Sequence, residues 1–124
     1  MAPGNQAFGA PSTGHRYFSS YANATALAND IGQHWMNYDA VSIGFVDGRY
    51  GRYLPYGLIN THMYTLAWVN YDGSGNVASL VLRNPWGFDT DSSSGPLDGY
   101  NDGYVTVTRD QLWSLVGAVD WGHV

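Results

Sequence analysis

The sequence contains no cysteine, no lysine and no glutamate, and each absence narrows what the chain can do. Without cysteine there is no disulfide, no thiolate metal ligand and no thiol nucleophile. All five basic residues are arginines and all ten acidic residues are aspartates. Charged residues make up only 12% of the chain, which is about half the usual share. Long helices with charged outer faces are therefore not expected.

Nucleic acid and membrane are both poor partners for this composition. The formal net charge is -5, and the sequence has no basic stripe that would neutralise phosphates. No apolar run approaches the roughly 20 residues that a membrane-spanning helix needs. We therefore expect neither a nucleic-acid partner nor a membrane partner. The acidic, lysine-free composition, rich in Gly, Asn and Asp, resembles that of secreted bacterial proteins.

The abundant residues indicate a β-rich globular domain. Apolar residues make up 44% of the 124-residue chain, which includes ten tyrosines, five tryptophans and sixteen glycines. This length suits one domain with one core, and aromatic residues with frequent glycine favour strands joined by turns. Residues 1–18 are interpreted as a flexible lead or linker, because they begin with the small-residue stretch MAPGNQAFGAPSTG. Residues 19–124 are expected to form the folded domain.

One amphipathic helix and several strands are predicted. Between residues 20 and 37, apolar residues recur at helical spacing: Ala24, Leu27, Ala28, Ile31 and Trp35. Alternating or β-branched stretches then predict strands at 39–46, 61–70, 76–84, 104–108 and 118–121, with a short helical turn within 109–116. The expected fold class is α+β and mainly β, with one N-terminal helix packed on an antiparallel sheet or a small barrel.

The strands at 61–70 and 76–84 are expected to form a hairpin around the turn residues between them. If Gly73 is the centre of that turn, Leu66 faces Leu80 and His62 faces Asn84. An imidazole and a carboxamide then meet at the open end of an apolar face. A one-residue bulge would shift the register and separate the two side chains.

This pair suits the chemistry of a thiol nucleophile. Histidine can remove the thiol proton and later protonate the leaving amine, because its ordinary pKa is about 6.5. An asparagine oxygen can hold the ring in one tautomer without adding charge. Trp86, two residues beyond Asn84, is expected to shield that hydrogen bond from water. A histidine beside an asparagine can equally be a structural pair, so on these residues alone both interpretations stay open.

Around the pair, the sequence resembles the calpain-type cysteine proteases. Residues 82–87, LRNPWG, are similar to that family's motif around its active-site asparagine. Pro85 favours calpains over papain-like enzymes, which generally show Asn-Ser-Trp-Gly. Residues 61–66, THMYTL, resemble the segment around the active-site histidine, although Thr61 and Met63 stand where the family usually has Gly and Ala. Similarity in order and spacing extends from about residue 20 to residue 121.

The resemblance implies the second subdomain of a papain-like, calpain-type catalytic core. His62 would be the general base, Asn84 would be its orienting amide, and the nucleophilic cysteine would lie in a first subdomain that this chain lacks. The chain would then be half of a cysteine endopeptidase that acts on polypeptides, and it would be inactive alone. Its partner would be the Cys-bearing subdomain, in the parent chain or in trans. The alternative is a degenerate, non-catalytic module that binds or regulates polypeptides.

Three tyrosines are candidates for a substrate cleft. Tyr50, Tyr53 and Tyr56 are spaced by three in a glycine-rich loop that precedes His62. Aromatic rings in such a loop could line a binding groove, and packing of the turn is an equally good explanation.

Four aspartates are candidates for a calcium site. Asp89, Asp91, Asp98 and Asp102 lie in and around a loop at 85–103, and Ca²⁺ prefers six to eight oxygen ligands. The calpain resemblance points to calcium in the corresponding region. Since the spacing is not that of an EF-hand, a solvated acidic loop remains the competing interpretation.

Overall fold

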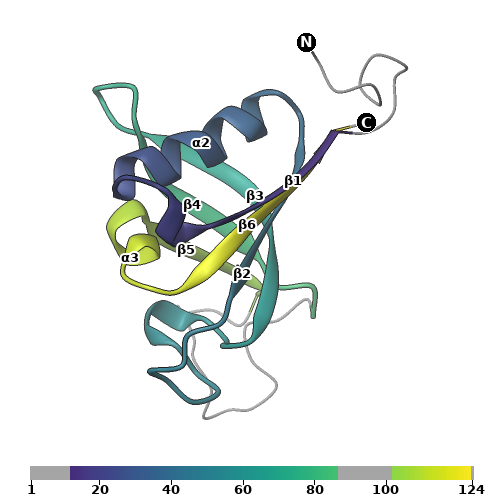
Figure 1. Ribbon diagram of the computed structural model, residues 1–124, viewed down its shortest axis with the longest axis vertical. Helices are drawn as coiled ribbons and strands as arrows, with labels where there is room; N and C mark the ends of the chain where they lie inside the picture. The colour runs from purple at the N-terminus through teal and green to yellow at the C-terminus, as the bar shows by residue number, and fades with distance from the viewer. Residues whose placement is uncertain (1–11, 87–101, 124) are drawn as a thin grey trace.

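The computed structural model describes residues 12–86 and 102–123, which form an α+β fold that is mainly β (Figure 1). Six strands make one antiparallel sheet in the order β1-β6-β2-β3-β4-β5. The strands are β1 (Ser12–Tyr17), β2 (Ala40–Phe45), β3 (His62–Tyr71), β4 (Val77–Arg83), β5 (Tyr104–Thr108) and β6 (Gly117–His123). The helices are α2 (Ala24–Met36) and α3 (Arg109–Trp113), with short 3-10 helices η1 (Phe18–Ser20) and η2 (Pro55–Gly57). Of the two expected arrangements, the described strands form the open sheet, with β1 and β5 at its edges.

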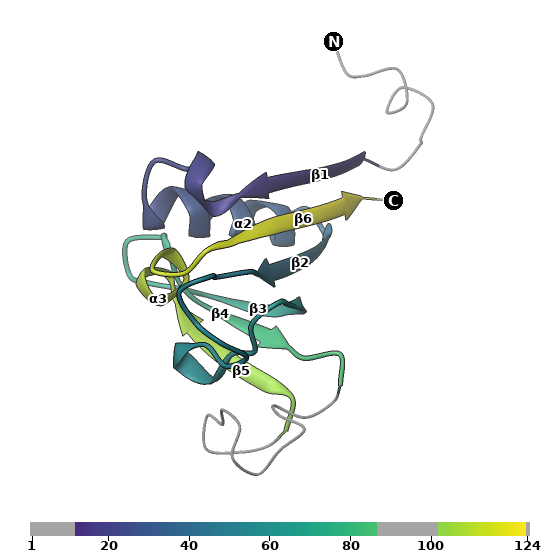
Figure 2. The ribbon, with the colours of Figure 1, turned by 60° about the horizontal axis from the view of Figure 1, so that its bottom comes forward.

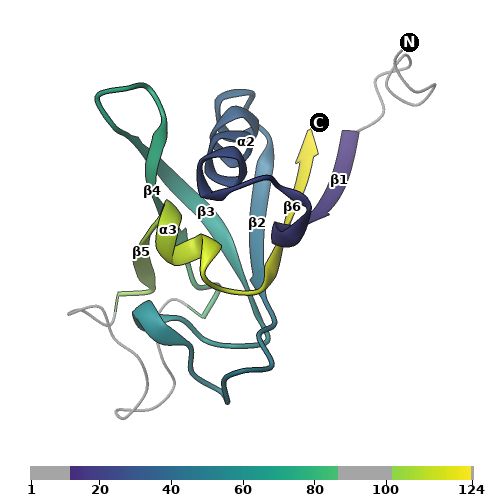
Figure 3. The ribbon, with the colours of Figure 1, turned by 60° about the vertical axis from the view of Figure 1, so that its left-hand side comes forward.

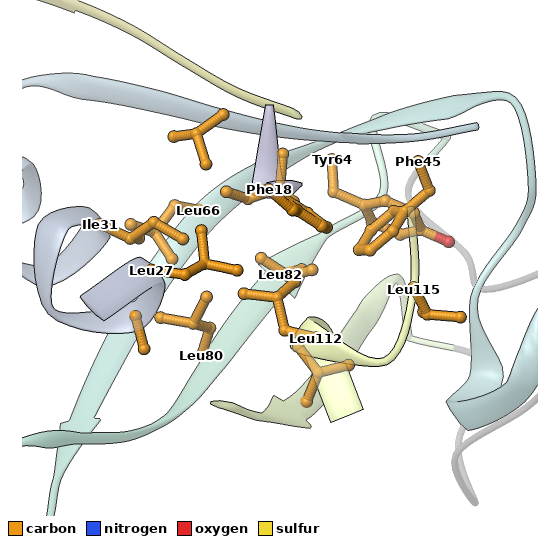
Figure 4. Close-up of a cluster of buried hydrophobic side chains, with 14 of the residues drawn as sticks. Phe18, Leu27, Ile31, Phe45, Tyr64, Leu66, Leu80, Leu82, Leu112 and Leu115 are labelled. Carbon is orange, nitrogen blue, oxygen red and sulfur yellow. The ribbon is translucent and has the colours of Figure 1, made fainter. Parts of the chain in front are cut away.

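Helices α2 and α3 lie over the same face of the sheet, as Figure 2 and Figure 3 show from two sides. The hydrophobic core fills the space between these helices and the sheet. In Figure 4, Leu27 and Ile31 of α2 and Leu112 of α3 meet Leu80 and Leu82 of β4, and all five side chains are fully buried. In β2 and β5, alternate apolar residues are buried on this face.

Helix α2 begins after Asn23 and ends at Met36, one residue before its predicted limit. The Asn23 side chain accepts a hydrogen bond from the Ala26 N–H at 2.8 Å, so Asn23 is the N-cap. Gly32 lets the helix approach β4, because a Cβ there would lie 2.6 Å from Val77 Cγ2. No helix in the described part of the chain is long and apolar enough to cross a bilayer.

The expected flexible lead of residues 1–18 is wrong from residue 12 onward. Residues 12–17 form β1, which pairs along its whole length with β6. Phe18 follows directly and is buried, with its ring edge-on to Phe45 at 6.0 Å between centroids. The side chains of residues 13–17 are mostly exposed, so pairing with β6 and not hydrophobic alternation defines this strand. Residues 1–11 lie outside the described residues.

The expected hairpin register is wrong by two residues, since Leu66 pairs with Leu82 and not with Leu80. The turn is the cause. The Asp72 side chain accepts hydrogen bonds from the backbone N–H groups of residues 74 and 76, at 2.8 and 3.1 Å, which centres the turn on residue 74 instead of Gly73. At the Leu66–Leu82 end of the hairpin, a shift of two residues keeps the expected faces, because side chains alternate with a period of two.

A bulge in β3 changes which side chains face the core farther along the strand. The ladder is irregular before Trp68, which pairs with Val81, so β3 carries one extra residue at Ala67. Val69 is buried beyond this point. Trp68, which the alternation predicts on the core face, is instead 56% exposed and packs edge-on against Trp35 of α2 at 4.9 Å.

We predict that Phe18→Ala lowers the free energy of unfolding by about 3–5 kcal/mol, the usual loss for a buried phenylalanine. The neighbouring Tyr17 is 63% exposed, so Tyr17→Ala is expected to lower it by about 1 kcal/mol or less. Chemical denaturation of both variants measures the difference. Equal small losses would mean that residues 12–18 are not part of the folded domain.

Candidate functional site

His62 and Asn84 lie at the end of the β3–β4 hairpin that is opposite to its turn. His62 begins β3 and Asn84 directly follows β4. If the ladder is extended from its Thr65–Arg83 pair, Asn84 lies across from Tyr64, and His62 reaches it diagonally. The predicted direct opposition is therefore wrong. The predicted contact is confirmed, because both side chains keep the core face and His62 Nε2 lies 2.8 Å from Asn84 Oδ1.

A second donor fixes the orientation of the Asn84 amide. The backbone N–H of Trp86 donates to Asn84 Oδ1 at 3.1 Å. Because a backbone N–H can only donate, the atom that faces it must be the amide oxygen. The same oxygen faces Nε2 of His62, so Nε2 carries a hydrogen. In the neutral ring Nδ1 is then a proton acceptor, which is the state that a general base needs.

The side chain of Asn84 is buried, and its main chain is anchored by a hydrogen bond. Asn84 is only 1% exposed, and its backbone N–H donates to the carbonyl oxygen of Gly103 at 2.7 Å. This bond ties the end of β4 to the residue before β5. A hydrogen bond in such a dry setting is electrostatically stronger than one in water. Asn84 is therefore a rigid acceptor for the imidazole.

Two aromatic rings contact the imidazole. The Trp86 ring lies 4.5 Å from the His62 ring, tilted by 52°, and the buried Tyr64 ring lies edge-on at 5.1 Å. Tyr64 is itself fixed, because its hydroxyl oxygen accepts the backbone N–H of Ile59 at 2.9 Å. Trp86 therefore stands beside the hydrogen bond where the sequence predicts it. Among residues 12–86 and 102–123, no group hydrogen-bonds to Nδ1 of His62.

Thr61, directly before His62, has a strained backbone. Its φ is 53°, in the left-handed region that β-branched residues rarely adopt. Such a conformation costs on the order of 1–3 kcal/mol. The Thr61 N–H donates to Asn60 Oδ1 at 3.0 Å, while the Thr61 side chain is exposed. The turn of the chain at this residue sets the direction in which β3 begins.

The predicted cleft tyrosines belong to the loop 46–61, which lies at the same end of the sheet as the start of β3 (Figure 3). Tyr50 and Tyr56 are exposed. Tyr53 is half-buried and forms a β-bridge with Ile59. The structure thus brings the loop to the end that carries His62. The role of its tyrosines as a cleft wall stays a prediction.

Asp47 is a buried carboxylate that the sequence reasoning did not single out. It is 1% exposed and accepts hydrogen bonds from Arg49 Nε and Nη2, at 2.9 and 2.6 Å, and from the Val116 N–H at 3.1 Å. The Arg49 side chain, with help from backbone donors, holds the pKa of Asp47 well below its ordinary value of 3.8, against the opposing effect of burial. The stability that Asp47 contributes is therefore present above about pH 4 and is lost as the pH falls toward its lowered pKa. In the sequence, only the turn-forming pair Asp47-Gly48 marks this position.

Most of the calcium candidates, Asp89, Asp91 and Asp98, lie outside the described residues. Asp102 is exposed, and its carboxylate accepts the Tyr104 N–H at 2.9 Å, which shapes the start of β5. Within the described ranges, no group of three or more His, Cys, Asp or Glu side chains could hold a metal ion. The calcium site stays a prediction.

Comparison with known proteins does not assign the chain to a family. The sequence matches no protein-family model, and a search of curated proteins also finds no match. The contacts of His62 and Asn84, and the sequence segments that carry them, are therefore the observations that bear on function.

We predict that Thr61→Gly raises the free energy of unfolding by about 1 kcal/mol, because glycine adopts a positive φ without steric cost. The matched control is Thr65→Gly, an exposed position in the same strand with ordinary extended backbone. There glycine is expected to lower stability by about 1 kcal/mol. Denaturation curves of the two variants test the opposite signs. A loss at both positions would argue against the left-handed conformation of Thr61.

Proposed function

We propose that this chain is the histidine- and asparagine-bearing half of a calpain-like cysteine endopeptidase. It supplies the general base and its orienting amide, and a separate domain supplies the cysteine thiol. The observation that carries the proposal is the 2.8 Å contact between His62 Nε2 and Asn84 Oδ1, because it leaves Nδ1 as the proton acceptor. The LRNPWG segment supports it further, since Asn84 and Trp86 of this segment are the residues that contact the imidazole.

In the proposed reaction, His62 carries two protons in turn, the first from the thiol to the leaving amine and the second from water to the sulfur. When the two halves dock, Nδ1 takes the thiol proton and a thiolate–imidazolium pair forms. The thiolate attacks the carbonyl carbon of the peptide, and the imidazolium gives its proton to the leaving amine as the C–N bond breaks. Water then attacks the thioester while His62 takes a proton from it, and that proton returns to the sulfur as the carboxylic acid product leaves.

Asn84 suits this cycle because it is a neutral acceptor. Nε2 carries a hydrogen in both the neutral and the charged imidazole, so the bond to Asn84 Oδ1 persists through every step. The amide orients the ring without adding a charge that would compete with the thiolate for the imidazolium. The rings of Trp86 and Tyr64 both contact the imidazole and restrict its rotation.

The two departures from the resembled motif are compatible with this role. Thr61 stands where the family usually has glycine, and its φ of 53° is one that glycine adopts readily. Met63 stands where the family usually has alanine, and its side chain is exposed. Neither substitution places a group between His62 and Asn84.

The loop 46–61 favours a second candidate, a non-catalytic module that binds polypeptides. The loop is held in place by Asp47 and presents the exposed rings of Tyr50 and Tyr56. A preformed aromatic surface can bind a peptide without any nucleophile, and this chain has no cysteine. Peptide binding by the isolated chain that is unchanged by His62→Ala would favour this candidate.

We predict that the isolated chain cleaves no peptide, and that mixing it with a calpain-type Cys-bearing subdomain produces cleavage of an unfolded polypeptide. In the mixture, His62→Ala is expected to reduce kcat by on the order of 10³-fold or more, because the thiol loses its base. The control is His15→Ala, since His15 is an exposed histidine of β1. Peptide fragments are measured by mass spectrometry over time.

Two results would contradict the proposal. One is a mixture in which the halves form a complex and yet cleave nothing. The other is cleavage that His62→Ala leaves at the level of His15→Ala, because the base would then be another group.

A further inference from the structure

Outside the His62–Asn84 pair, the most heavily hydrogen-bonded side chain at this end of the sheet is the amide of Asn60. Its Oδ1 accepts from the backbone N–H groups of Asp47 at 2.9 Å and Thr61 at 3.0 Å. Its Nδ2 donates to the carbonyl oxygens of Asp47, Gly51 and Tyr50 at 2.8, 2.8 and 3.2 Å. An amide has two hydrogens and two oxygen lone pairs, so this group is saturated. All of its partners are backbone atoms.

This amide closes the end of the β2–β3 ladder. The last pair of the ladder joins Phe45 to His62, and beyond it the chain leaves the sheet as the loop 46–61. Asn60 bridges the two ends of that loop, at Asp47 on one side and Thr61 on the other. It takes the place of the sheet hydrogen bonds at the point where the ladder stops. The start of β3 is thereby held at a fixed separation from the end of β2.

Asp47 ties this closure to a third segment. Its carboxylate accepts the N–H of Val116, one residue before β6, at 3.1 Å. Arg49, which pairs with the same carboxylate, also donates from Nη2 to the Ser114 carbonyl oxygen at 2.7 Å. The Arg49 side chain lowers the pKa of Asp47, so this anchor stays charged below the pH at which an ordinary aspartate takes up a proton. Asn60 is therefore fixed to a frame that includes the connection between α3 and β6.

We infer that Asn60 is a positioning residue for His62, acting through the N–H of Thr61 and the backbone of Asp47. It contacts neither Asn84 nor the imidazole, and it would touch neither substrate nor thiol. The effect of Asn60 on catalysis rests on the proposed function. The effect of Asn60 on the position of the imidazole does not. Placement is important because a shift of about 1 Å in a catalytic group can reduce the rate by on the order of 10²-fold.

The strained residue between Asn60 and His62 makes this coupling direct. Thr61 holds a φ of 53°, and the hydrogen bond from its N–H to Asn60 Oδ1 offsets part of that strain. Without the acceptor, the backbone at Thr61 can relax toward the extended region that threonine prefers. Such a rotation lies directly before His62, so it redirects the imidazole away from Asn84.

The placement is tested on the isolated chain by comparing Asn60→Ala with Asn29→Ala. Asn29 is the control, because its amide also cross-links two segments: its Oδ1 accepts from the Val77 N–H at 2.8 Å and its Nδ2 donates to Asn76 Oδ1 at 3.0 Å. It lies beside the hairpin turn, and the ten residues of β3 separate the two ends by roughly 30 Å. Asn60→Ala is expected to shift and broaden the imidazole NMR signals of His62, while Asn29→Ala leaves them in place. Unmoved signals in both variants overturn the inference.

Asn60→Asp is the second variant, in case the alanine variant does not fold. It keeps an oxygen acceptor for the N–H groups of Asp47 and Thr61, and it loses the three contacts to carbonyl oxygens. Since the proposed path runs through the acceptor, the His62 signals of Asn60→Asp are expected to stay close to those of the wild type. A folded aspartate variant whose His62 signals shift and broaden would contradict this path.

Activity of the two-domain mixture gives an independent readout. Asn60→Ala is expected to lower kcat by roughly 10- to 100-fold with little change in KM, because the base is displaced and the substrate contacts remain. Asn29→Ala is expected to leave kcat unchanged. If the wild-type mixture cleaves nothing, the proposed function fails, and the NMR comparison still decides the placement. An unchanged kcat in Asn60→Ala overturns the inference.

Discussion

The hydrogen bond from His62 Nε2 to Asn84 Oδ1 is the interaction on which the functional account depends. The direction of this bond follows from the backbone N–H of Trp86. Because that N–H can only donate, the Asn84 atom that faces both Trp86 and His62 must be the amide oxygen. A reversed amide would face Trp86 with a second donor and leave a buried N–H without an acceptor there. One backbone donor thus determines the tautomer of the imidazole and the chemistry open to Nδ1.

The rest of the fold holds this bond at one end of a sheet. Burial of Asn84 and the bond from its N–H to Gly103 fix the acceptor. The loop closure by Asn60, with the left-handed Thr61, fixes the strand that carries the donor. The helices pack on the same sheet face, where they bury the apolar core (Figure 4), and the His62–Asn84 pair lies at the end of β3 and β4. Stability and proposed chemistry therefore occupy different parts of one face.

Periodicity in the sequence predicts much of this arrangement, and local hydrogen bonds explain where it fails. The helix, the β3–β4 hairpin and the short strand β5 follow from apolar spacing, which reports burial. Strand β1 could not be predicted, because its exposed side chains leave no alternation. The register could not be fixed either, since it depends on the Asp72 side chain and on the bulge at Ala67. The His62–Asn84 contact survived this error only because the shift was even. Asn60 gave no signal, since its partners are backbone groups brought together by the fold.

The central claim is most directly tested by the imidazole proton of His62 in the isolated wild-type chain. Long-range ¹H–¹⁵N NMR, recorded at a pH where the ring is neutral, identifies which nitrogen carries the hydrogen. The account predicts a hydrogen on Nε2 that exchanges with water more slowly than the ring hydrogen of the exposed His15. A neutral ring with its hydrogen on Nδ1, or an Nε2 hydrogen that exchanges as fast as that of His15, would contradict it.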